Sequence, residues 1–155
     1  HTYVQQNIPL LVEYAQKVAD SHGAAHKETL EINNLVKVIA EELMAHLQKE
    51  EIILFPFVRE MVIAKKEGKN IEEMHCHSVN NPIRAMEMEH ENAGELFRHI
   101  SEISNNYCPP EDACATYRVL YAKLEEFEKD LHQHVHLENN ILFPKSIALE
   151  QEVVN

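Results

Sequence analysis

Residues 46–56 read HLQKEEIILFP, and residues 134–144 read HVHLENNILFP. Both stretches contain a histidine, a glutamate four residues later and then Ile-Leu-Phe-Pro. Residues four apart are neighbours on one face of a helix, with Cβ atoms about 5–6 Å apart. The two stretches are 88 residues apart, and the same separation relates the apolar Leu43 to Leu131. We therefore expect two helices of the same build that run parallel, each presenting a histidine and a glutamate on one face.

Apolar residues follow a helical pattern through the rest of the chain. They recur at alternating steps of three and four, which is typical of a helix that buries one face in a bundle. The four stripes are Val4, Ile8, Leu11, Ala15 and Val18; Ile32, Val36, Ile39, Leu43, Ile53 and Phe57; Ile83, Met86, Ala93, Phe97 and Ile100; and Tyr117, Leu120, Leu124, Phe127, Leu131 and Ile141. Turn residues separate the stripes near residues 22–23, 65–70 and 105–110. We predict an all-α, up-and-down four-helix bundle over residues 1–150, followed by a C-terminal tail at residues 151–155.

Composition and charge limit the partners that this chain can have. Its 155 residues suffice for one domain core, and only three of them are glycine, which favours helix. The formal charge of −12 repels nucleic acid and anionic membrane surfaces, so we expect neither as a partner. The apolar runs are too short to cross a bilayer, no leader opens the sequence, and the three cysteines lack CxxC spacing. We expect a cytoplasmic protein with free thiols, and its oligomeric state stays open.

Histidine and glutamate fill the gaps in the apolar stripes. Six polar residues fall on these inward faces, namely His1, His46, Glu50, His90, His134 and Glu138. Burying several such groups without partners would cost a few kcal/mol each. Residues on consecutive helices share a level when the turn lies midway between them, and the midpoints between successive histidines of this set fall at or beside the three turns. We therefore expect all six side chains to meet in one layer.

The other histidines do not belong to this layer. His22 lies on the first stripe, but a rise of 1.5 Å per residue places it about 30 Å from His1, at the turn. We expect solvated side chains at His26, His75, His77 and His99, and surface or outer positions at His132 and His136.

Four imidazoles and two carboxylates inside a helical bundle indicate a metal site. The two glutamates suit bridging between two ions, whereas a single ion would leave ligands unused. Structural zinc prefers four ligands, often thiolates, and the cysteines lie off this layer. A ferritin-like site would need glutamate at positions 43 and 131, where this chain has leucine. The residues therefore favour two irons and a different ligand pattern.

The motifs that carry this pattern resemble those of a known family. Besides the two duplicated stretches, residues 89–95 read EHENAGE and residues 105–114 read NNYCPPEDAC. Together they resemble the hemerythrin-like domain of the di-iron repair-of-iron-centres proteins, from His1 to about Ala148. The resemblance implies a pair of non-haem iron ions with an oxo or hydroxo bridge. The implied ligands are His1, His46, Glu50, His90, His134 and Glu138, with both glutamates as bridges.

The resemblance also implies a function. Members of this family restore iron-sulfur clusters damaged by nitric oxide or oxidants in bacteria, and we expect iron donation, nitric oxide binding and reduction, or both. The expected partners are iron-sulfur proteins as clients and a diatomic ligand, nitric oxide or dioxygen. A second hypothesis is a protein that binds or senses dioxygen or nitric oxide reversibly, without turnover. A third is a structural zinc or metal-free bundle, so the sequence leaves open whether the chain is an enzyme.

The chain departs from related patterns in two ways. Oxygen-carrying hemerythrins have a fifth histidine on the third helix, one turn from the histidine that corresponds to His90. At those positions this chain has Met86 and Gly94. One coordination position should then lack a protein ligand, and Gly94 is either room for a diatomic ligand or a packing contact. Glu42 and Glu89 are either relays for protons or iron or solvated carboxylates. The family's small N-terminal cysteine-bearing domain is missing, so we expect a fragment of a longer protein.

Overall fold

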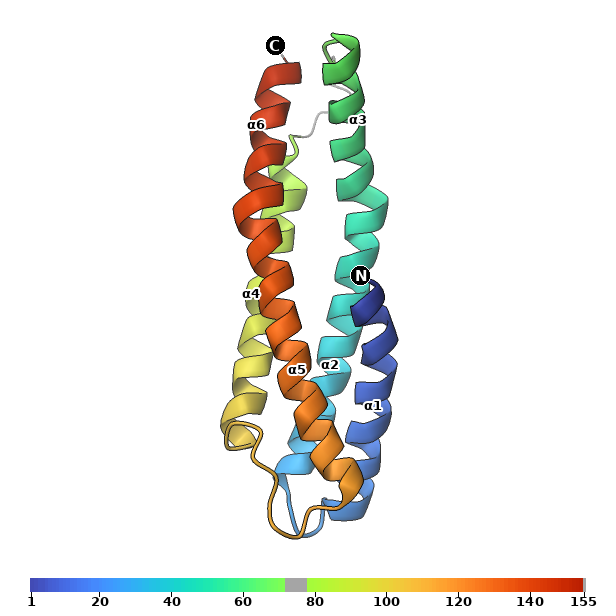
Figure 1. The fold of residues 1–155 in the computed structure, drawn as a ribbon, viewed down its shortest axis with the longest axis vertical. Coiled ribbons are helices and arrows are strands. Elements are labelled where there is room, and N and C mark those ends of the chain that lie inside the picture. Colours follow the sequence, from blue (N-terminus) through green and yellow to red (C-terminus); the bar gives the residue numbers. More distant parts are fainter. Residues whose placement is uncertain (72–77, 155) are drawn as a thin grey trace. The chain divides into compact units, whose positions relative to one another are not determined.

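A computed structural model describes residues 1–71 and 78–154 of the chain, and within these residues it contains helices and no strand (Figure 1). The helices are α1 (Thr2–His22), α2 (Glu28–Lys49), α3 (Phe55–Glu67), α4 (Asn80–Ile103), α5 (Ala115–Leu137) and α6 (Phe143–Val153). Two π-helical turns, η1 (Glu50–Leu54) and η2 (Glu138–Leu142), join α2 to α3 and α5 to α6. The prediction of an all-α fold with four long helical segments is confirmed. His75 and His77 lie outside the described residues.

The chain forms two compact units, and α2, α4 and α5 contribute to both. The first unit contains residues 1–44 and 92–132, and the second contains residues 45–91 and 133–155. None of the described helices is long and apolar enough to span a bilayer.

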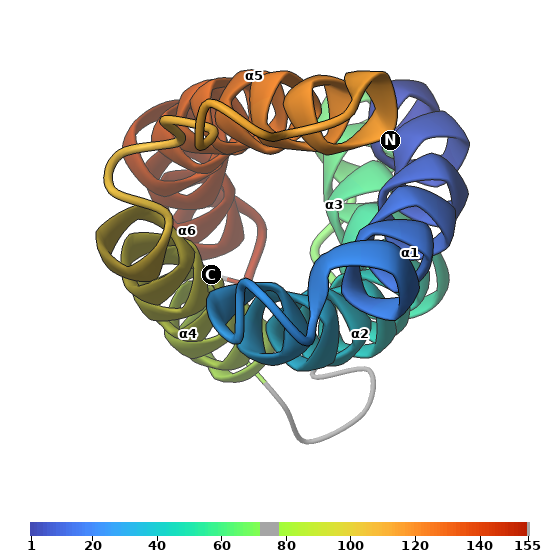
Figure 2. The same cartoon turned by 90° about the horizontal axis from the view of Figure 1, so that it is seen from below.

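In the first unit, parts of α1, α2, α4 and α5 surround a shared interior (Figure 2). The interior is filled by the residues that the apolar stripes predicted, and Phe97 stacks on Phe127 with ring centroids 5.7 Å apart. His26, which we expected to be solvated, is only partly exposed, and its Nε2 lies 2.9 Å from Asp112 Oδ1. This ion pair ties the α1–α2 turn to the segment that precedes α5.

The second unit is built from α3, α6, the two π-turns, the first half of α4 and the last residues of α2 and α5. Helices α3 and α6 lie side by side (Figure 1). Its core contains Leu54, Met61, Val79, Ile83, Met86, Phe143 and Val153. The start of α4 is fixed by Glu150 of α6, whose carboxylate accepts hydrogen bonds from the Val79 amide and the Ser78 hydroxyl at 2.7 and 2.6 Å. The first backbone amides of a helix have no acceptor within the helix, and here α6 supplies an acceptor for the one at Val79.

The two π-turns explain the repeated Ile-Leu-Phe-Pro. In each turn a phenylalanine amide donates to a carbonyl five residues back, from Phe55 to Glu50 and from Phe143 to Glu138. The next residue is proline, which has no N–H and whose ring clashes with the carbonyl four residues back in an α-helix. A π-turn at this position lets the chain stay helical beyond the proline. Both helices therefore continue, to Glu67 and Val153.

Each π-turn also changes which residues face the core. The stripes predicted Ile53 and Ile141 in the core, and this prediction is wrong, because their side chains are 52% and 44% exposed. Leu54 and Phe143 are buried instead, at 1% and 0% exposure. A constant helical period does not include the extra residue of a π-turn.

This register gives a matched pair of substitutions. Leu54→Ala should lower the free energy of unfolding by roughly 2–5 kcal/mol, because it empties a packed position. Ile53→Ala should change it by no more than about 0.5 kcal/mol, because the side chain faces solvent. Denaturant unfolding at equal metal loading measures both values, and a larger loss for Ile53→Ala would contradict the π-turn register.

Candidate metal centre

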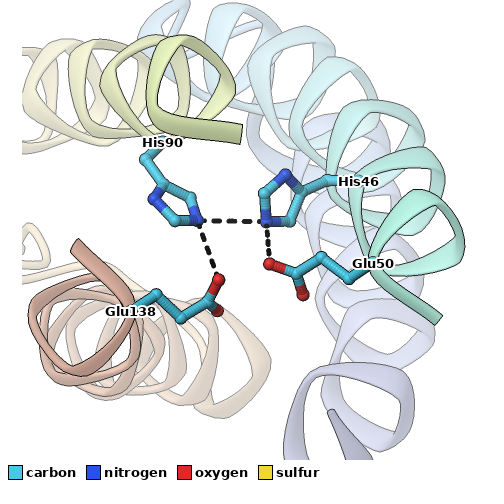
Figure 3. A group of neighbouring side chains, drawn as sticks. All are labelled: His46, Glu50, His90 and Glu138. Carbon is cyan, nitrogen blue, oxygen red and sulfur yellow. Dashed lines mark hydrogen bonds and ion pairs between the residues drawn. The ribbon is translucent and has the colours of Figure 1, made fainter. Parts of the chain in front are cut away.

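The second unit brings four of the six predicted ligands into one cluster. His46, Glu50, His90 and Glu138 each offer a ligand atom, and these four atoms all lie within 4.8 Å of one another (Figure 3). All four residues are at least nine-tenths buried. His46 lies in the last turn of α2, His90 lies in α4, and the glutamates are the first residues of the two π-turns. The turns that re-register the core thus begin at the two carboxylates.

The spacing of the ligand atoms suits a metal ion. His46 Nε2 lies 3.1 Å from both His90 Nε2 and Glu50 Oε1, and His90 Nε2 lies 3.7 Å from Glu138 Oε2. Metal bonds to nitrogen and oxygen of about 2.0–2.2 Å place neighbouring ligand atoms of one ion about 3–3.5 Å apart. The observed separations are close to those of atoms that share an ion.

Both imidazoles direct the same nitrogen into the cluster. His46 Nδ1 donates to Glu89 Oε2 at 2.9 Å, and His90 Nδ1 donates to Asn139 Oδ1 at 2.9 Å. These oxygens can only accept, so each Nδ1 carries the proton and each Nε2 presents its lone pair. Two lone pairs 3.1 Å apart repel each other unless a proton or a cation lies between them. Metal-bound histidines regularly donate their other ring N–H to an acceptor in the way that these two histidines do.

The two buried carboxylates differ in their protonation. Burial, together with the neighbouring Glu138, raises the pKa of Glu50 to about 7, although the hydrogen bond with His46 acts in the opposite direction. Burial also acts upward on the pKa of Glu138, but hydrogen bonds with His134 and Glu50 outweigh it and the net shift is downward. Near neutral pH the shifts therefore favour a proton on Glu50 and an ionised Glu138. Binding of a cation must displace that proton, so metal uptake depends on pH.

The two central histidines also differ. Burial lowers the pKa of His90, which keeps its imidazole neutral and available as a ligand. Burial alone would lower the pKa of His46 too, but hydrogen bonds with Glu50 and Glu89 outweigh it and the net shift is upward. The raised pKa favours a proton on His46, and a bound cation would compete with that proton.

His134 and His1 lie outside this group of four. His134 contacts the Glu138 carboxylate through Nε2, as expected for residues four apart, and its side chain is 22% exposed. His1 belongs to the first unit, where it is the N-cap residue of α1 and is partly exposed. Their role as ligands stays a prediction.

The remaining histidines take other positions. His22 ends α1 in the first unit and meets the edge of the Tyr117 ring at a centroid distance of 5.0 Å. His132 and His136 are exposed on α5. His99 is 46% exposed and pairs with Glu31 at the surface.

Three further predictions concerned residues beside the ligands. Glu89 is not simply solvated, because it accepts from His46 and also pairs with Lys49. Glu42 is exposed and lines a surface pocket of the first unit. A Cβ atom at Gly94 would meet nothing within 4 Å, so this glycine makes no close packing contact.

Asn139 was missed by the sequence reasoning. Adjacent residues of an α-helix point about 100° apart, so a search at spacings of three and four skips the neighbour of a ligand. The available signal was the polar pair Asn139-Asn140 within an otherwise apolar stretch.

Comparison with known proteins assigns the family. Residues 1–146 match the model of the hemerythrin HHE cation binding domain. The chain belongs to this family, and the all-α fold and the buried His/Glu cluster agree with a cation-binding domain of this kind.

The curated relatives are bacterial. The chain is 38% identical over 145 residues to a probable iron-sulfur cluster repair protein of Haemophilus influenzae, covering 94% of this chain and 59% of the relative. It is 36% identical over 150 residues to the iron-sulfur cluster repair protein YtfE of Escherichia coli, covering 97% and 62%. The chain thus spans about three fifths of the length of these relatives.

Removal of a carboxylate should empty the centre. Loss of a residue that only hydrogen-bonds to a metal ligand weakens metal binding by about 10–100-fold. Glu50→Ala or Glu138→Ala removes a predicted ligand itself and should weaken binding by at least as much. Metal retained after dialysis, measured by mass spectrometry, tests this prediction. His22→Ala is the matched control and should retain full occupancy. Loss of metal from the control alone would show that the centre has been misplaced.

Proposed function

We propose that the chain holds two non-haem iron ions through His1, His46, Glu50, His90, His134 and Glu138. The observation that carries this proposal is the pair of Nε2 lone pairs directed at each other between two buried carboxylates. This arrangement requires a positive charge at its centre. The donor atoms of the centre are nitrogen and oxygen. Cys108 and Cys114 are exposed and belong to the first unit, whereas the cluster belongs to the second.

The carboxylates, the imidazoles and the acceptors bonded to the imidazoles would each have a separate role at the ions. Glu50 and Glu138 would bind the ions through their buried carboxylates. The imidazoles would bind without adding charge, while Glu89 and Asn139 keep the Nδ1 protons in place. When bound, two ferrous ions supply the two electrons that, with two protons, convert two nitric oxide molecules to nitrous oxide and water. Burial of the cluster excludes bulk water from this site.

We further propose that the protein acts in repair of iron-sulfur clusters damaged by nitric oxide or oxidants in the bacterial cytoplasm. The names of both relatives support this role, and the predicted unfilled coordination position suits iron release or a diatomic ligand. The clients would be iron-sulfur proteins with damaged clusters, and the iron of this centre would be transferred to them. Nitric oxide would bind at the same position.

The proposal is tested by iron transfer. Anaerobically iron-loaded protein should restore the cluster absorbance of an iron-sulfur protein previously bleached by nitric oxide, and it should lose a matching amount of iron. Nitrous oxide should form when nitric oxide is added. The Glu138→Ala variant, incubated with the same iron, should do neither.

Two results would contradict this function. Reversible uptake of dioxygen or nitric oxide, with no nitrous oxide and no transferred iron, would favour a carrier or sensor. A zinc-only protein that transfers nothing would leave a structural role.

A further inference from the structure

We propose that Asn139 is a positioning residue that fixes the tautomer and orientation of His90 and makes it a weaker electron donor than His46. This inference rests on the proposed metal centre and deepens it. It concerns an outer partner of one ligand, and it follows from contacts within the second unit.

Three residues of the η2–α6 segment hold the His90 ring. Asn139 Oδ1 accepts from Nδ1 at 2.9 Å, and Glu138 Oε2 lies 3.7 Å from Nε2. The Phe143 ring is stacked nearly parallel to the imidazole, at 7° with centroids 5.8 Å apart. Consecutive residues of one turn thus face the two nitrogens of one ring, and the phenylalanine restricts its rotation.

The chemistry of the amide decides the tautomer. Neutral imidazole carries one proton, and a carbonyl oxygen beside Nδ1 accepts it there. Nε2 is then left with its lone pair directed into the cluster. Without Asn139, the proton could move to Nε2 and block that ligand position. Asn139 therefore acts on the metal through His90.

The duplicated stretches do not repeat this feature. The counterpart of Asn139 in the first stretch is Glu51, which is exposed, whereas His46 Nδ1 is bonded to Glu89 of α4. A carboxylate acceptor makes an imidazole more basic than an amide acceptor does, since a negative charge stabilises the donated proton. The two halves are therefore electronically unequal, with a neutral partner on His90 and an anionic partner on His46.

The first test uses substitutions of Asn139. Asn139→Leu removes the acceptor at similar size and should weaken cobalt(II) binding by about 10–100-fold. Asn139→Asp keeps an acceptor, so it should restore binding and also lower the reduction potential of the iron-loaded centre. Asn140→Leu is the matched control, because Asn140 is exposed and its amide bonds to His136, one turn earlier in α5, rather than to His90. It should bind cobalt as the unaltered protein does.

The second readout needs no metal. In ¹⁵N NMR spectra of the metal-free protein, His90 should carry its proton on Nδ1, and in Asn139→Leu part of it should move to Nε2. Unchanged cobalt affinity and an unchanged tautomer in Asn139→Leu would overturn the positioning role. So would a failure of Asn139→Asp to restore binding while the variant unfolds at the same denaturant concentration as the unaltered protein.

These measurements are independent of repair activity. A protein that binds cobalt and responds to Asn139 as described, yet transfers no iron, would contradict the proposed function and support the positioning role.

Discussion

The structure depends on the burial of two carboxylates against two imidazoles whose lone pairs face each other. Such a group is unstable in a protein interior by itself, because each buried charge or unmatched lone pair loses its hydration. A shared cation would convert these opposed groups into ligands of one centre. Burial raises the pKa of Glu50, and hydrogen bonds with Glu50 and Glu89 raise that of His46, so protons are favoured in the place of that cation when no metal is bound.

The π-turns connect this centre to the fold of the second unit. Each begins at a carboxylate of the cluster and ends where proline would otherwise break the helix. Because the extra residue rotates the buried face, Leu54 and Phe143 enter the core immediately beyond the ligands. Phe143 packs both into this core and onto the His90 ring, so the packing of the unit also orients a ligand. The repeated sequence therefore lets a helix continue beyond a glutamate that we predict to be a metal ligand.

Much of this could be predicted from the sequence, because helical periodicity and burial leave regular marks. The stripes from Val4 to Val18 and from Ile83 to Ile100 are buried as expected. The four inward residues of the cluster stood out as polar residues in apolar faces. The sequence could not reveal the π-turns, because an inserted residue is invisible to a fixed period, and Ile53 and Ile141 were misplaced for that reason. It also missed Asn139 and the His26–Asp112 pair, which depend on the directions of side chains rather than on their spacing.

We propose that the buried cluster forms part of a two-iron centre. The most direct test is metal analysis of anaerobically purified protein, combined with its absorption and Mössbauer spectra. We expect about two irons per chain, with the spectra of a coupled pair. Zinc alone, or less than one metal ion per chain after growth with ample iron, would contradict it.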